Sequence, residues 1–387
     1  MNISLNWDSI KKNASINAIG TMGFGNFIGS VISSIFWIVI AGFLGTENYG
    51  QISYLLAIIG IFSVVSMFGG QYTMQVYTSK QIKLESSLYL ISIVSGTSLA
   101  IILFILFQDI GVSISLIGIT VLNFYFSEMI GKKLFSKYSL IYVIQKILFV
   151  SFSLILYHLI GFEGILIGYG LSHFIFVKHV FKILSNEKFN LKLLNSKKKI
   201  IFYNYASELT ATARNNIDKI LIVPFFGLSL LGNYFLSMQI ISLMYILPGI
   251  VIKYTIGEDS REKSTLKVKS ITIFISFVLA LLGAFVGTAF LPVFFPQFID
   301  AIELLPILSF AVIPRTVSLM IMSKFLATEK NFHITMANLV TFFLLSLGII
   351  LSFQFYEDVG LAYSYVIGMA GNSFYLIFIY FYKKSIK

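Results

Sequence analysis

Long apolar stretches alternate with short polar segments along almost the whole chain of 387 residues. A helix needs about 20 predominantly apolar residues to cross the hydrocarbon core of a bilayer. Inside lipid every backbone N–H and C=O group needs an internal partner, so runs of this length are expected to be helical. The pattern predicts an all-α, polytopic membrane protein with about twelve transmembrane helices. We expect them near residues 22–44, 51–70, 87–107, 110–130, 139–160, 163–184, 201–225, 231–254, 270–295, 303–326, 332–354 and 359–382.

The charges in the predicted loops indicate an orientation. Loops after the odd-numbered helices contain no Lys or Arg but do contain acidic residues such as Asp109 and Glu163. Loops after the even-numbered helices are rich in Lys, for example Lys132 and the cluster in 185–199. Because cytoplasmic loops carry the excess of Lys and Arg, both termini are predicted to be cytoplasmic. The same loops explain the net charge of +11, so no nucleic-acid partner is predicted.

Composition excludes several kinds of chemistry. The chain has no cysteine, and its four histidines lack the spacing of metal ligands, so neither a metal site nor another cofactor is predicted. The longest loop, 185–199, is too short for a soluble catalytic domain, and no phosphate-binding GxxxxGK[ST] motif is present. We therefore do not expect an enzyme.

A pair of glycines recurs between the two halves of the sequence. FLGTENYGQI (43–52) and FFGLSLLGNY (225–234) place Gly45 opposite Gly227 and Gly50 opposite Gly232, each pair 182 residues apart. The same offset carries the third predicted helix onto the ninth.

This repeat predicts a domain organisation. We expect two six-helix lobes, residues 1–184 and 200–387, joined by the basic cytoplasmic linker 185–199. An even number of helices in each repeat makes the two repeats parallel. Transporters built from such repeats bind substrate between them, near the middle of the bilayer.

The seventh predicted helix carries several polar residues. A charge at the bilayer centre costs at least about 2.5–3.5 kcal/mol, so it normally faces a cavity or a partner. Arg214 and Asp218 are four residues apart and are expected to pair. Two interpretations stay open: a structural ion pair, or an arginine held ready for an anionic group with Asp218 as its resting partner. The other polar residues of this segment are Glu208, Asn215, Asn216 and Lys219.

Three further charges lie within predicted helices. Arg315 follows Pro314 in the middle of the tenth helix, too deep to reach either interface. Lys146 and Glu128 lie toward cytoplasmic helix ends, where a lysine can extend to the interface, so a structural role stays open for Lys146 and is favoured for Glu128. The candidate substrate-binding residues are Arg214, Arg315, Lys219, Lys146, Asn215 and Asn216. The candidate gating or ion-coupling residues are Asp218, Glu208 and Glu128.

Two short motifs resemble those of a known family. LG-x3-YG (Leu44 to Gly50) follows the first helix, and D-K-I-L-I followed by G-x4-G-x-Y spans Asp218 to Tyr234. The chain thereby resembles Wzx-type polysaccharide and O-antigen flippases of the multidrug/oligosaccharidyl-lipid/polysaccharide (MOP) exporter superfamily. The resemblance implies a V-shaped, MATE-like bundle of two lobes in a prokaryotic plasma (inner) membrane. It also implies an oligosaccharide on a polyprenyl (pyro)phosphate as substrate, held in a cationic central cavity.

The first functional hypothesis is therefore a flippase for lipid-linked oligosaccharide, working by alternating access. Its partners would be its substrate, the bilayer and polysaccharide assembly proteins, and coupling to Na⁺ or H⁺ is left open. The alternative is a cation-coupled multidrug exporter, which predicts a cavity dominated by acidic residues such as Glu208 and Asp218. A membrane-embedded glycan polymerase or ligase is disfavoured because the outer loops are short.

Overall fold

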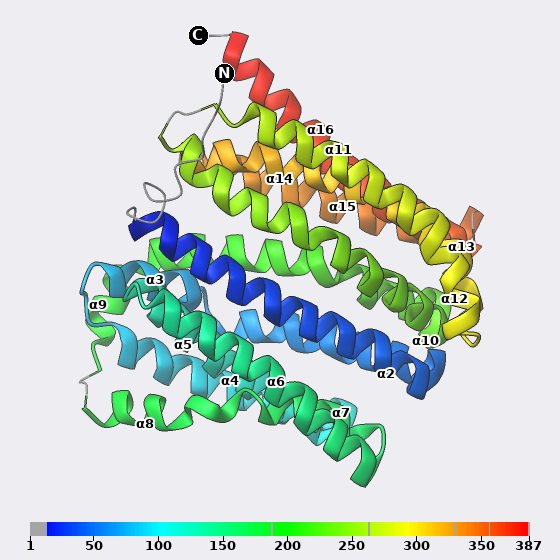
Figure 1. Cartoon of the computed structure of the whole chain (residues 1–387). Helices are drawn as coiled ribbons and strands as arrows, with labels where there is room; N and C mark the ends of the chain where they lie inside the picture. The colour runs from blue at the N-terminus through cyan, green and yellow to red at the C-terminus, as the bar shows by residue number, and fades with distance from the viewer. Residues whose placement is uncertain (1–13, 187–188, 262–263, 329, 356, 386–387) are drawn as a thin grey trace.

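The computed structural model describes residues 14–186, 189–261, 264–328, 330–355 and 357–385. The described chain is helical throughout, as predicted, and its helices run between two ends of one bundle (Figure 1). The elements of the N-terminal half are α2 (Ala14–Met67), α3 (Gly70–Ser79), α4 (Glu85–Phe107), α5 (Ile110–Gly131), α6 (Phe135–Ile160), α7 (Glu163–Leu171), η1 (Phe174–Phe176) and α8 (Val177–Asn186). After α9 (Leu191–Ser196) the C-terminal half contains α10 (Lys198–Asp259), α11 (Leu266–Leu282), the π-helix η2 (Gly283–Gly287), α12 (Thr288–Phe294), α13 (Ile299–Ser309), α14 (Val312–Ala327), α15 (Asn331–Phe355) and α16 (Glu357–Ser385).

Eight helices of the described chain are long and apolar enough to cross a membrane. The pair α13 and α14, bent by 41° at its break, makes a ninth span if it is counted as one. Large apolar side chains project from the bundle, among them Phe43, Phe285 and Phe374, each at least two-thirds exposed. Such a surface suits lipid and would be unusual in water.

The helices α2 and α10 each contain two antiparallel arms. Gly45 (φ 71°) interrupts α2, and Gly227 (φ 86°) interrupts α10. The hydroxyl of Tyr49 donates to the carbonyl oxygen of Trp37 at 2.9 Å, although twelve residues of straight helix would span about 18 Å. The chain therefore reverses at each glycine, where a positive φ is tolerated. The arms of α2 are residues 14–44 and 46–67, and those of α10 are 198–226 and 228–259.

The two reversal turns interlock across the halves. A Cβ atom on Gly50 would collide with the carbonyl oxygen of Leu228, and one on Gly232 would collide with that of Thr46. Thr46 and Leu228 are themselves 182 residues apart, so the two contacts are related in the same way as the glycine pairs in the sequence. A hydrogen bond of 2.9 Å from the Ser229 hydroxyl to the Thr46 hydroxyl completes the contact. We call these residues the glycine interlock.

An aromatic cluster lies next to the glycine interlock. Trp37 of α2 contacts Phe235 of α10 with ring centroids 5.8 Å apart, and Tyr49 stacks at a tilt on Phe235 at 4.8 Å. Phe36 packs edge-on against Phe149 of α6 at 4.6 Å. Because all five side chains are buried, the two halves share one hydrophobic core at this end.

Basic and acidic loops lie at opposite ends of the bundle. The turns 80–84 and 132–134 are at the end where α2 begins and α16 ends, and we call this the basic end. The turns 108–109 and 161–162 lie with the glycine interlock at the other, acidic end. The predicted orientation, with the basic end in the cytoplasm, stays a prediction, as do the domain limits 1–184 and 200–387.

Replacing Gly50 by alanine should destabilise the protein. The new methyl group forces the backbones of α2 and α10 apart, which is expected to cost about 1–3 kcal/mol. The melting temperature of the purified protein in detergent measures the loss. Gly20→Ala is the control, because a Cβ at Gly20 meets no atom within 4 Å. Equal melting temperatures for the two variants would contradict the interlock.

Candidate functional site

A cleft of about 520 Å³ lies between the two halves. Its walls are the first arm of α2, the middle of α6 and the second arm of α10. Trp37 lines the cleft and belongs to the aromatic cluster, so that cluster closes the cleft toward the acidic end. From Gln239 to Lys253 the α10 wall is about 21 Å long at 1.5 Å per residue. The cleft thus reaches from the aromatic cluster toward the basic end.

The cleft lining is polar and basic. Among the described residues that line it none is Asp or Glu. Its amide and serine side chains are Asn26, Ser30, Ser33, Ser34, Gln239 and Ser242. Ser34 of α2 and Ser242 of α10 share a hydrogen bond of 3.0 Å across the cleft. Two lysines, one from each half, supply the charge: Lys146 and Lys253.

Lys146 comes from α6 and has aromatic neighbours. Its Nζ atom lies 5.4 Å from the ring centroid of Tyr142 and 6.0 Å from that of Phe149. These are cation–π distances, and no carboxylate of the described residues pairs with this lysine. Its ammonium group is therefore available to an anionic ligand in the cleft.

Lys253 faces the cleft from the opposite half. Its side chain passes Gly23 of α2, where a Cβ atom would lie 3.8 Å from the lysine Cδ. Sequence reasoning missed this residue because a lysine near the end of an apolar run is typical of a side chain that reaches the interface. The helical spacing of Gln239, Ser242, Ile246, Gly249 and Lys253 was the available signal, since these residues share one face.

The expected pair of Arg214 and Asp218 is wrong. Asp218 instead accepts a hydrogen bond of 2.8 Å from the hydroxyl of Tyr234 and lies 3.4 Å from Nζ of Lys219. Arg214 donates from Nη2 to the side-chain oxygen of Asn215 at 2.7 Å. The i,i+4 spacing predicts contacts within one helix, but the reversal at Gly227 brings Tyr234 of the second arm onto Asp218.

Arg214 and Arg315 come together inside the C-terminal half. Arg214 is 7% exposed, and its charge lies within repulsive range of Arg315 in the first turn of α14. The hydroxyls of Tyr245 of α10 and Tyr365 of α16 lie close enough to both arginines to interact electrostatically with their charges. Neither arginine is among the residues that line the cleft, whereas Tyr245 does line it. Tyr245 therefore stands between the cleft and the two arginines.

The remaining polar residues of the first α10 arm make contacts within the protein. Lys219 donates from Nζ to the carbonyl oxygen of Asn215 at 2.9 Å, and Asn216 donates to that of Thr212 at 2.9 Å. The amide of Asn216 also lies against Gly60 of α2, where a Cβ would be 3.3 Å away. Both hydrogen bonds lie within the arm, the amide of Asn216 also approaches α2, and none of these side chains is among the residues lining the cleft.

Glu208 links the two halves nearer the basic end. Its Oε1 atom accepts from the backbone N–H of Tyr72 at 2.8 Å, while Oε2 has no hydrogen-bond partner among the described residues. Tyr72 lies in the first turn of α3, whose N-cap residue, Gly69, offers no side-chain cap. Free N–H groups at a helix N-terminus favour a carboxylate. The neighbouring Asn204 donates to the hydroxyl of Thr73 at 3.1 Å.

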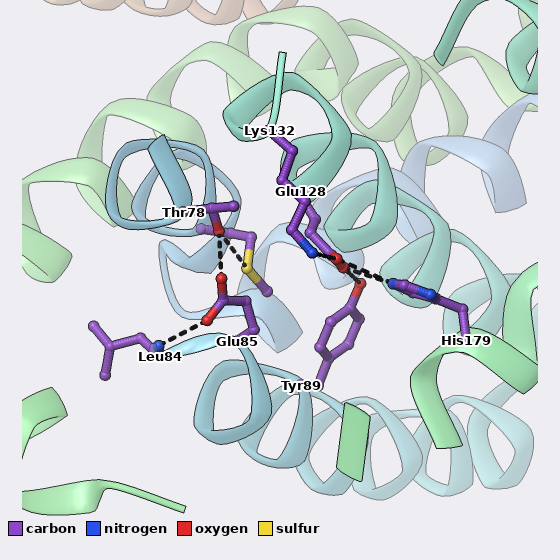
Figure 2. Close-up of polar contacts among 8 residues, drawn as sticks. Thr78, Leu84, Glu85, Tyr89, Glu128, Lys132 and His179 are labelled. Carbon is purple, nitrogen blue, oxygen red and sulfur yellow. Dashed lines mark hydrogen bonds and ion pairs between the residues drawn. The ribbon is translucent and has the colours of Figure 1, made fainter. Parts of the chain in front are cut away.

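Glu128 belongs to a buried cluster within the N-terminal half (Figure 2). Its carboxylate contacts Lys132 Nζ at 2.5 Å, His179 Nε2 at 2.9 Å and the hydroxyl of Tyr89 at 3.0 Å. These partners join α8 to α4 and α5. In the same view Glu85 accepts from Thr78 at 3.1 Å. Glu128 is separate from the residues that line the cleft.

A comparable buried carboxylate, that of Asp259, holds helices together at the basic end of the C-terminal half. Asp259 accepts from Lys269, Thr265 and Ser323, each at 2.6 Å. Burial alone would raise the pKa of Asp259, but these hydrogen bonds outweigh burial and hold its pKa below the ordinary value. Asp259 thereby holds the end of α10 and the start of α11 against α14.

Comparison with known proteins identifies the fold. No protein-family model matches the chain, and no curated protein matches it by sequence. Among solved structures, the lipid II flippase MurJ in an inward closed conformation matches with a TM-score of 0.76 and 15% identity over 92% of this chain and 87% of that one.

Two further structures match at a TM-score of 0.68 and 14% identity. One is an inward-facing multidrug resistance MATE transporter of the MOP superfamily, with 94% of each chain covered. The other is a MOP superfamily transporter from Pyrococcus furiosus, with 100% of this chain and 98% of that one covered. At these identities the similarity shows the fold alone. The predicted MATE-like fold class is confirmed, and these structural neighbours are transporters.

Replacing Glu208 by alanine should loosen the contact between α3 and α10. The chain has no cysteine, so a cysteine introduced at the buried Thr73 reports opening through its reaction with a water-soluble maleimide. We expect labelling to be roughly fivefold faster, since an interaction at a helix N-terminus is worth about 1 kcal/mol. Glu208→Gln keeps an acceptor oxygen for the Tyr72 N–H but loses the charge, so it should label at an intermediate rate. An unchanged rate in Glu208→Ala would show that the carboxylate does not hold the two halves together.

Proposed function

We propose that this protein is a flippase that moves an oligosaccharide linked to polyprenyl (pyro)phosphate from the cytoplasmic to the outer leaflet. One observation carries the proposal: the cleft between the halves has a lysine on each side, Lys146 and Lys253, and no carboxylate among its described lining residues. A cleft with this charge attracts an anionic group and repels a cationic one. We place the protein in a prokaryotic plasma membrane with both termini in the cytoplasm. Its proposed partners are polysaccharide assembly proteins.

The cleft offers the two kinds of contact that such a headgroup needs. Lysine is a common ligand of phosphate, acting as a point charge. The amides and hydroxyls of Asn26, Ser30, Ser33 and Gln239 can hydrogen-bond to sugar hydroxyls. The headgroup would cross the membrane in this cleft while the polyprenyl chain stays in the bilayer. Modest binding suits the task, because the same charge must be released on the other side.

The contacts between the halves suggest how access would alternate. At the acidic end the glycine interlock and the aromatic cluster join the halves, and the cleft extends from there toward the basic end. Outward release requires the interlock to separate and the halves to close over Lys253. Glu208 holds α3 against the first arm of α10, so breaking this contact would let the halves move, and we assign Glu208 to gating. We also propose that H⁺ or Na⁺ couples to transport by binding at Glu208 or Asp218.

A cation-coupled multidrug exporter is the second candidate, favoured by the similarity to MATE structures. Such an exporter needs acidic residues where its cationic cargo binds. The two buried carboxylates in the first arm of α10, Glu208 and Asp218, are engaged by Tyr72 and Tyr234 and are not among the residues lining the cleft. The charge of the cleft therefore favours the flippase.

Genetic complementation tests the proposal. In a host that lacks its own flippase, the wild-type chain should restore surface glycan, and Lys146→Gln with Lys253→Gln should abolish it because the headgroup loses both cations. Each single variant should reduce the glycan at least several-fold. Protein level in the membrane and the pool of lipid-linked precursor are measured alongside, so that poor expression is recognised.

Lys80→Gln is the matched control, since Lys80 is exposed at the basic end, away from the cleft. Full glycan in the double variant would contradict the role of the lysines. Export of an organic cation dye by the wild type, unaffected by the double variant, would favour the multidrug exporter.

A further inference from the structure

Two arginines inside the C-terminal half, Arg214 and Arg315, lack the counter-charge that buried charges require. Arg214 is 7% exposed, and Arg315 is half-buried and repels it. Neither forms an ion pair with a carboxylate of the described residues. Placing two like charges together in the membrane interior is unfavourable unless an anion compensates them.

One donor in this cluster also lacks an acceptor. The Nε–H group of Arg214 is buried and has no hydrogen-bond partner among the described residues. The hydroxyl of Tyr245 is equally buried and lies next to the hydroxyl of Tyr365. Buried donors without acceptors are rare in proteins, because each loses its bond to water. Here the unpartnered N–H group of Arg214 lies beside a second positive charge, that of Arg315.

The carboxylate of Asp218, one turn after Arg214 in α10, is already engaged. The charge of Asp218 interacts electrostatically with the hydroxyl of Tyr365, which also interacts with the charges of both arginines. However, Asp218 accepts a hydrogen bond from Tyr234, pairs with Lys219 and does not compensate the charge of Arg214. Movement of Asp218 toward Arg214 would break the Tyr234 hydrogen bond in the buried core. No carboxylate among the described residues thus compensates the two arginines, and an anion from solution can supply the missing charge.

We infer that Arg214, Arg315 and Tyr245 bind a small inorganic monovalent anion such as chloride inside the C-terminal half, apart from the headgroup cleft. A guanidinium group stays charged and directs several N–H donors at one acceptor. The enclosure of Arg214 and of the Tyr245 hydroxyl favours an ion of halide size over a lipid headgroup. This assignment does not depend on the proposed substrate. It replaces the expectation that the two arginines contact the headgroup directly.

The position of Tyr245 gives the anion a connection to transport. Its side chain lines the cleft, and its hydroxyl lies in the arginine cluster. The bound anion would hold the Tyr245 ring in place as part of the cleft wall. Without the anion the two arginines would repel each other, and the Tyr245 ring would no longer be held in place in the cleft wall.

Thermal unfolding of the purified full-length protein tests the site. A ligand that binds only the folded state raises the melting temperature. In sodium chloride the wild type should melt several degrees higher than in sodium gluconate of equal ionic strength. Arg315→Gln and Arg214→Gln should lose this difference, and Tyr245→Phe should reduce it. Lys80→Gln removes an exposed cation at the basic end, away from both sites, and should keep the full difference.

A structural readout covers variants that do not fold. Crystals of the wild type grown in bromide should show an anomalous scattering peak among Arg214, Arg315 and Tyr245. Equal melting in chloride and gluconate, or a chloride response that survives Arg315→Gln, would overturn the site. Stabilisation by undecaprenyl phosphate but not by chloride, lost in the arginine variants, would also overturn it and would assign the arginines to the headgroup.

Discussion

The glycine interlock is the contact on which the rest of the structure depends. Gly50 and Gly232 let the backbones of two reversal turns meet without intervening side chains. That approach brings Trp37 and Tyr49 onto Phe235 and joins the two halves into one core at the acidic end. Because the halves meet there, they can enclose a cleft toward the other end. Cleft and interlock are thus two consequences of one close backbone contact.

The buried charges fall into three groups with different physical roles. Glu128 and Asp259 are compensated within one half and hold helices and turns together. Glu208 is compensated by a helix N-terminus of the other half, so its contact depends on how the halves are arranged. Lys146, Lys253, Arg214 and Arg315 have no carboxylate partner among the described residues. Positive charge without a partner is the feature that distinguishes this interior, and it favours anions both as cargo and as a bound ion.

The sequence allowed much of the fold to be predicted, and less of the site. Hydrophobic runs located the helices because lipid leaves no alternative to helical hydrogen bonding. The spacing of the repeated glycines predicted two repeats but not that the glycine turns meet, because the approach of each glycine to a facing carbonyl is visible only in three dimensions. The Arg214–Asp218 pair failed because local spacing carries no information about Tyr234, which arrives from the other arm of the hairpin. Lys253 was missed because its position near a helix end has a simpler explanation in sequence.

Flipping in reconstituted vesicles tests the central claim most directly. Vesicles containing the purified protein receive a fluorescent oligosaccharide on a short polyprenyl pyrophosphate, and a membrane-impermeant quencher reports the fraction in the outer leaflet. The account predicts that the wild type moves the lipid between leaflets and that the Lys146→Gln, Lys253→Gln variant, present at the same density, does not. Equal rates for the two proteins would contradict the claim that the cleft lysines carry the anionic headgroup.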